Sequence, residues 1–134
     1  MDNIKVVFND CLRLLTNSKR KDHARISDMI KELGWLFINQ LCAETRLQEA
    51  WKTVHKEKYC MQDILHVKKR NQHMSTRSSE QILLEPGQGN KFVRGSFVQK
   101  TAQIWNLAPR KVKESTTIFQ AKKAIREFVT TLPL

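Results

Sequence analysis

The first third of the chain has the hydrophobic period of α-helices. Apolar residues recur every three or four positions, a spacing that gathers side chains on one side of a helix; the first set is Ile4, Val7, Phe8, Cys11, Leu12, Leu14 and Leu15. We therefore predict a helix over residues 3–16. Asp22 is predicted to begin a second helix as its N-cap, because its carboxylate accepts hydrogen bonds from free N–H groups. Gly34 is predicted to end that helix, because glycine readily adopts the left-handed conformation found there.

Two more helices are predicted before residue 71. The apolar run at residues 35–38 leads into a longer helical pattern over residues 41–58. A shorter helix is expected over residues 61–70. The links between these helices are short, so neighbouring helices are expected to pack antiparallel.

Residues 71–95 lack this period. Residues 71–79 are polar, and the sequence Glu-Pro-Gly-Gln-Gly-Asn at 85–90 is typical of a loop. The apolar residues on either side of this loop, at 82–84 and 92–93, are predicted to form short extended segments. The middle of the chain is thus expected to be a loop or short extended segment.

Helical periodicity returns after residue 95. One predicted helix carries Phe97, Ala102 and Trp105 on its apolar face and ends at Pro109. Trp105 is expected in the core, with stacking on a nucleic-acid base as the alternative. Thr117 and Gln120 have the spacing of a capping box, which predicts the start of a last helix. The apolar face of that helix is expected to comprise Ile118, Ala121, Ile125, Phe128, Val129 and Leu132, with the methylenes of Lys122 alongside.

These patterns predict a mostly α-helical fold. Its parts are N-terminal helices over residues 1–70, a basic loop or short extended segment over 71–95, and a C-terminal helix pair over 96–134, together forming one domain. Four glycines and three prolines are too few for a sandwich or barrel with many tight turns. Hydrophobic residues make up 40% of the chain, less than in most soluble domains, so a core that depends on a partner is plausible.

Cysteine usage and hydropathy predict an intracellular protein, in the nucleus or the cytoplasm. The three cysteines are widely spaced and include no Cys-x-x-Cys pair, so neither a disulfide framework nor a zinc site is expected. No apolar run reaches the roughly 18 residues of a membrane span. The first residues also lack the pattern of a secretory signal.

Positive charge is concentrated in the middle of the chain. The net charge is +11, and residues 64–113 carry ten basic but only two acidic residues. Such a field favours phosphate backbones over neutral partners, whereas the alternative is a solvated surface that aids solubility. Ser78 is counted as a candidate contact with nucleic acid, because a hydroxyl beside an arginine suits a phosphate contact. The candidate contacts with RNA or DNA are Lys68, Lys69, Arg70, Arg77, Ser78, Lys91, Arg94, Lys100, Arg110, Lys111 and Lys113.

The partner is expected to be an RNA or DNA backbone, with no membrane contact. No segment combines a clean apolar face with a basic one, as a membrane-surface helix does. Base-specific recognition is not expected, because the sequence has no helix-turn-helix or zinc-finger pattern.

Motifs of catalysis and cofactor binding are absent from the sequence. It contains no phosphate-binding GxxxxGK[ST] or GxGxxG, no HExxH and no GxSxG. Paired aspartates that would hold catalytic magnesium are also absent. We therefore expect no catalytic residue, no metal and no cofactor.

Five blocks, in order along the chain, resemble the C-terminal region of reverse transcriptases from non-LTR retrotransposons of the LINE type. The blocks are CLRLLT at 11–16, LGWLFI at 33–38, TRSS at 76–79, Phe97 with TAQIWNLAP at 101–109, and Phe119 with KKAIREF at 122–128. They are similar to the family's LR.LTG, LGWLPI, TRS, F…TA.LWN.LP and FK..L..F blocks. The chain departs from them at Asn17, where the family often has glycine, and at Phe37, where it usually has proline.

The resemblance implies a fragment that lacks the catalytic core of the polymerase. The family's metal-binding aspartates lie in a palm-domain [FY]ADD motif, which this sequence lacks. The implied function is a non-catalytic part of the enzyme that helps to hold RNA template or target DNA, with the remainder of the reverse transcriptase as a possible partner. Two alternatives stay open: a structural piece that docks on the polymerase thumb, and a domesticated helical DNA-binding protein.

Overall fold

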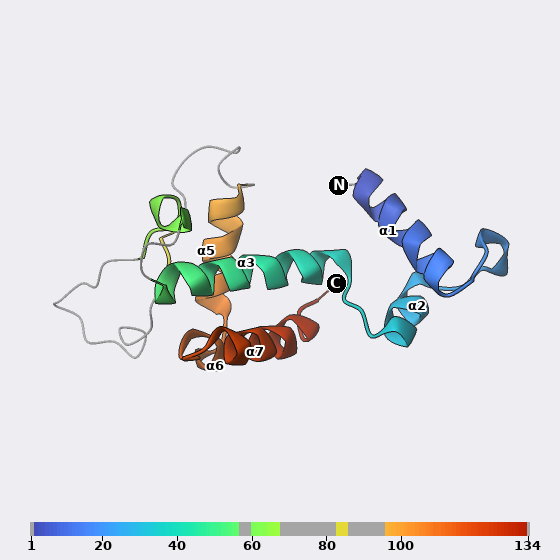
Figure 1. Cartoon of the computed structure of the whole chain (residues 1–134). Helices are drawn as coiled ribbons and strands as arrows, with labels where there is room; N and C mark the ends of the chain where they lie inside the picture. The colour runs from blue at the N-terminus through green and yellow to red at the C-terminus, as the bar shows by residue number, and fades with distance from the viewer. Residues whose placement is uncertain (1, 57–59, 68–82, 86–95, 134) are drawn as a thin grey trace. The chain divides into compact units, whose positions relative to one another are not determined.

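The computed structural model is mostly α-helical, as predicted (Figure 1). It describes residues 2–56, 60–67, 83–85 and 96–133. The chain divides into two compact units, Met1–Leu41 with Leu134, and Cys42–Pro133. The α-helices are α1 (Asp2–Leu15), α2 (Ile26–Leu33), α3 (Ile38–His55), α5 (Phe97–Leu107), α6 (Arg110–Lys113) and α7 (Ile118–Thr130), and the 3-10 turns are η1 (Arg20–Asp22) and η2 (Cys60–Asp63).

The first unit has a small core between α1 and α2. α1 confirms the helix predicted for residues 3–16, but Leu12 is its only buried residue. Leu12 packs with Met29 and Ile30 of α2, and half-buried Phe8 and Phe37 border this cluster. The apolar face of α1 is therefore only partly covered.

The link between α1 and α2 differs from the prediction. Asp22 does not cap α2, so that prediction was wrong; it lies in the η1 turn, where its Oδ2 accepts a hydrogen bond of 2.7 Å from the backbone N–H of Lys19. His23 follows with a left-handed φ of 50°, and α2 begins at Ile26. The carboxylate thus stabilises the η1 turn, and α2 begins later in the chain than predicted.

Gly34 ends α2 as predicted. Its φ of +62° lies in the left-handed region, where a glycine avoids the steric cost of a Cβ atom. Two hydrogen bonds close the helix end: the N–H of Gly34 donates to the carbonyl of Lys31, and the N–H of Trp35 to that of Ile30. This is the bonding pattern of a Schellman motif.

α3 begins three residues earlier than predicted. The side chain of Gln40 explains the early start, because its Oε1 accepts a hydrogen bond of 3.2 Å from the backbone N–H of Phe37. The predicted helix over residues 61–70 is wrong. Among its described positions, 61–67, the only helical element is the η2 turn, and Val67 instead makes an antiparallel bridge with Leu84. Extended pairing uses backbone groups that a continued helix would have needed.

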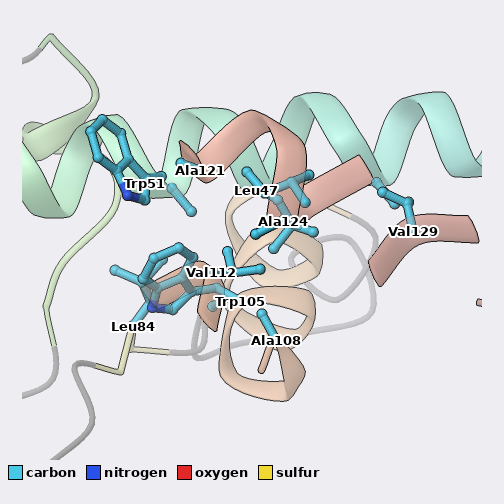
Figure 2. Close-up of a cluster of buried hydrophobic side chains, with 13 residues drawn as sticks. Leu47, Trp51, Leu84, Trp105, Ala108, Val112, Ala121, Ala124 and Val129 are labelled. Carbon is cyan, nitrogen blue, oxygen red and sulfur yellow. The ribbon is translucent and has the colours of Figure 1, made fainter. Parts of the chain in front are cut away.

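The second unit has the larger core (Figure 2). Trp105 of α5 is fully buried, together with Val112 of α6 and Ile125 of α7. Trp51 of α3 is also buried, and its indole N–H donates a 3.2 Å hydrogen bond to the carbonyl of Ser115. The core therefore joins α3 to the three C-terminal helices.

The start of α7 agrees only in part with the predicted capping box. Thr117 is the N-cap, and its hydroxyl accepts a 3.3 Å hydrogen bond from the N–H of Gln120. The side chain of Gln120, however, accepts a 3.0 Å bond from the Thr116 hydroxyl. Lys122 is exposed on this helix. The buried face is formed by Ala121, Ala124, Ile125 and Val129.

Within the described ranges, no helix has both the length and the apolar character needed to cross a membrane.

Candidate nucleic-acid interface

Four of the eleven predicted contacts lie among the described residues. They are Lys100 on α5 and Arg110, Lys111 and Lys113 on α6. The other seven fall outside the described residues: Lys68, Lys69, Arg70, Arg77, Ser78, Lys91 and Arg94.

Lys100 is an exposed cation of α5. The hydroxyl of Ser96 caps that helix and accepts a 3.3 Å hydrogen bond from the N–H of Gln99. Lys100 follows in the same first turns, on a helix whose opposite face buries Thr101, Ala102 and Trp105. The charge of Lys100 thus faces solvent on a helix whose other side is packed in the core.

Arg110 and Lys111 are exposed but paired. The Arg110 Nε lies 3.0 Å from Glu114 Oε1, and the Lys111 Nζ donates to Glu127 Oε2. The hydrogen bond from Lys111 and its positive charge lower the pKa of Glu127. Both pairs are solvent-exposed, and exposed ion pairs add little stability, so a phosphate group competes with the carboxylates at little cost.

Lys113 is a correction to the predicted contact set. Its side chain is only 5% exposed, and its ammonium donates a 3.0 Å hydrogen bond to the backbone carbonyl of Asn106. Desolvation by burial lowers the pKa of Lys113. A lysine held in this way faces the protein interior and does not reach a phosphate.

The chain on either side of residues 68–82 is fixed to the second unit. Val67 forms the bridge with Leu84, and the N–H of Glu85 donates a 2.8 Å hydrogen bond to the carbonyl of His66. The side chain of Asn106 bonds both backbone groups of Leu84, at 3.0 Å each. Residues 66–67 and 84–85 therefore meet beside α5.

Asn106 was not among the predicted site residues. The signal was present in the sequence, because a polar residue follows Trp105 at the apolar end of a helix, inside one of the five blocks. Its partners are backbone atoms more than twenty residues away, and residue type alone does not reveal such a pairing.

Trp105 does not stack on a base. Its side chain is fully buried among Leu84, Ala108 and Val112 of the second core, as the prediction of a core tryptophan expected (Figure 2).

Other functional groups in the described part of the chain are scattered. No set of three or more His, Cys, Asp or Glu side chains there is arranged to hold a metal ion. Cys11 and Cys60 are exposed free thiols, and Cys42 is a half-buried one. His55 stacks on Trp51 with a centroid distance of 4.5 Å and an interplanar angle of 11°, and its Nδ1 lies 3.1 Å from the carbonyl of Trp51.

Comparison of the chain with protein-family models, curated proteins and solved structures gives no match.

Proposed function

We propose that this chain binds the phosphate backbone of RNA or DNA and catalyses no reaction itself. The observation that carries the proposal is the concentration of ten basic and two acidic residues in residues 64–113. Phosphate neutralisation and counterion release supply most of the affinity in such binding, so a local excess of cations matters more than any single residue.

The fold supports this proposal by giving the basic residues a scaffold. Lys100 is exposed on a helix whose other side is buried, and Arg110 and Lys111 are exposed and form surface ion pairs. Lys113 is removed from the contact set because it is buried. The remaining candidates between residues 68 and 94 enter the proposal by sequence alone.

The resemblance of the five blocks supports a further proposal, about the kind of protein to which the chain belongs. We propose that the chain is a C-terminal fragment of a LINE-type reverse transcriptase, in which it would hold template or target rather than form bonds. The resemblance covers nearly the whole chain, and it supplies no catalytic residue to assign here.

The test is the salt dependence of binding. The full chain is titrated against a labelled single-stranded RNA and a duplex DNA at salt concentrations between 50 and 300 mM. The logarithm of the association constant is expected to fall linearly with the logarithm of salt, by roughly 0.9 per neutralised phosphate on duplex and about 0.7 on a single strand. An affinity that does not change over this range contradicts the proposal.

A matched pair of charge reversals localises the interface. Lys100→Glu and Lys31→Glu change the net charge equally at exposed helical positions, but only Lys100 lies in the basic stretch. Lys100→Glu is expected to weaken binding and to make the salt slope shallower by about one contact or more. An equal effect of both reversals would indicate a diffuse attraction of the whole protein, and would contradict an interface at residues 64–113.

A second candidate function is docking to the remainder of a reverse transcriptase. It is favoured by α1, on which Ile4, Val7 and Leu14 are 60%, 62% and 81% exposed. Beside α1, the first unit has an apolar hollow of about 210 Å³ lined by residues that include Phe8 and Ile30. Replacement of Ile4, Val7 and Leu14 by glutamine should then abolish capture of a polymerase fragment and leave nucleic-acid affinity unchanged. The reverse result would exclude this role for α1.

A further inference from the structure

We infer that the exposed side of α5 binds a single strand of nucleic acid, with the ring of Phe97 stacked on a base and the ammonium of Lys100 on a phosphate. The inference rests on the proposed function. It adds to that function a ligand with accessible bases and a contact residue that carries no charge. Both residues belong to the described part of the chain, at the start of α5.

The exposed residues of α5 form a continuous stripe along the helix. Residues three or four positions apart are neighbours on a helix surface. The exposed residues follow this spacing, and they are Phe97, Lys100, Gln103 and Leu107. The other side of the helix is packed in the core of the second unit, where Trp105 is fully buried (Figure 2). Tertiary packing therefore holds the helix that carries the stripe.

Phe97 is the aromatic residue of the stripe. It is 37% exposed, so part of its surface is open to a ligand while the rest is covered by the protein. A partly covered ring has less rotational freedom to lose when a ligand binds, and this preorganisation favours affinity. Every base has a π face, so an aromatic side chain can stack on bases without sequence preference.

The charges of this part of the chain favour an anionic ligand. Lys100 is the one charged residue among the eleven of α5, and it follows Phe97 by three positions. Residues 86–113 contain no Asp or Glu, so α5 presents no carboxylate that would repel a phosphate. Because one sugar joins a base to its phosphate, two neighbouring side chains can contact both groups of a nucleotide.

The stacking contact makes the site specific for a single strand. In a duplex the faces of the bases are covered by their neighbours, and proteins read the base edges in the grooves. A single strand can turn its bases outward, where aromatic side chains stack on them. The ligand class is thus single-stranded nucleic acid, RNA and DNA alike, since neither contact uses the 2′-hydroxyl.

The experiment measures binding of the full chain to two labelled DNA strands of equal length, one with bases and one made of stable abasic units. The strands carry the same phosphates, so a difference in affinity reports on the bases. We expect the unaltered chain to bind the strand with bases about fivefold more tightly, at the low end for one stacked base. Phe97→Leu keeps an apolar side chain without a ring. It should lose this roughly fivefold advantage and bind the abasic strand as before.

Phe119→Leu is the matched control for the loss of a ring. Phe119 is 79% exposed on α7, outside the stripe, and its replacement should change neither affinity. Phe97→Tyr keeps an aromatic ring at the site and should bind both strands as the unaltered chain does. Far-UV circular dichroism of each variant checks that the helices are intact.

Salt dependence separates the roles of the two contacts. Stacking releases no counterions, so Phe97→Leu should lower the affinity for the strand with bases at every salt concentration, with an unchanged log–log slope. Lys100→Gln removes a phosphate contact and should make that slope shallower by about 0.7. A shallower slope in Phe97→Leu would show that the variant disturbs phosphate contacts, and would overturn the assignment of its ring to a base.

Failure of this inference and failure of the proposed function are distinguishable. If the unaltered chain shows no salt-dependent binding, both fall. If it shows salt-dependent binding but Phe97→Leu retains full affinity for the strand with bases, only the inference is overturned. Equal losses in Phe97→Leu and Phe97→Tyr also overturn it, because the ring would then not be the group that binds. A changed oligomeric state of Phe97→Leu with unchanged affinity would overturn it by assigning the stripe to a second copy of the chain.

Discussion

The two units of this chain begin from similar hydrophobic patterns and reach very different degrees of burial. In the second unit, the described core contains thirteen buried residues, contributed by α3, α5, α6 and α7 together with Leu84 and Ala108. In the first, the buried cluster consists of Leu12, Met29 and Ile30. Helical period predicts that a helix forms, but the amount of apolar surface it buries depends on how many other elements meet it.

The largest expected effect tests the second unit. Trp105→Ala removes a fully buried indole from the core and is expected to reduce the free energy of unfolding of that unit by about 3–5 kcal/mol. Urea unfolding followed by circular dichroism measures the loss. Phe119→Ala is the control, because Phe119 is 79% exposed and its loss should change stability by less than about 0.5 kcal/mol. Comparable losses in both variants would contradict the assigned core.

The next effect tests the independence of the smaller core. Leu12→Ala is expected to cost about 2–4 kcal/mol, because a buried leucine leaves a cavity, and the loss should stay within the first unit. Hydrogen exchange read by mass spectrometry should show faster exchange in α1 and α2 and unchanged protection in α5 and α7. Exposed Leu14 provides the matched control, Leu14→Ala. Equal loss of protection in all four helices would show that the two units unfold together.

A smaller effect concerns the start of α7. Thr117→Ala removes the hydroxyl that accepts a hydrogen bond from Gln120, and the loss of an N-cap typically costs about 1 kcal/mol. Thr130→Ala serves as the comparison, because its hydroxyl bonds only the preceding turn of the same helix, at Glu127. A cost for Thr117→Ala no greater than that for Thr130→Ala would argue against the cap.

The last prediction concerns the sign of a pH dependence. Burial lowers the pKa of Lys113 from its ordinary value. At pH values between that lowered pKa and the unfolded value of about 10.4, the unfolded chain binds more protons than the folded one, so stability rises with pH in this window. The unfolding free energy of the unaltered chain minus that of Lys113→Met should therefore rise as the pH rises towards 10. Parallel profiles, or a decrease, would show that Lys113 is not buried in this way.

Local patterns predicted much of the fold. The helix over residues 3–16, the end of a helix at Gly34 and the burial of Trp105 all follow from side-chain spacing or backbone preference, and the structure has them. These features are determined by residues within one or two turns of each other. The mostly helical fold followed for the same reason.

Features set by distant residues were missed. The predicted helix over 61–70 gave way to the pairing of Val67 with Leu84, and charge alone did not reveal that Lys113 is buried under Asn106. The prediction for Asp22 was wrong for a different reason. Its carboxylate accepts a hydrogen bond from the backbone N–H of Lys19 and not from an N–H group at the start of α2. For the candidate interface, composition located the basic stretch, whereas the choice of exposed cations within α6 required the fold.

The most direct test of the central claim is an amide chemical-shift titration of the full chain with a short single-stranded RNA at low salt. We expect the perturbed amides to fall within residues 64–113, including those of Lys100, Arg110 and Lys111 on the described helices, with α1 and α2 unchanged. Shifts concentrated in α1 and α2, or spread evenly over both units, would contradict the claim that the basic middle of the chain is the surface that meets nucleic acid.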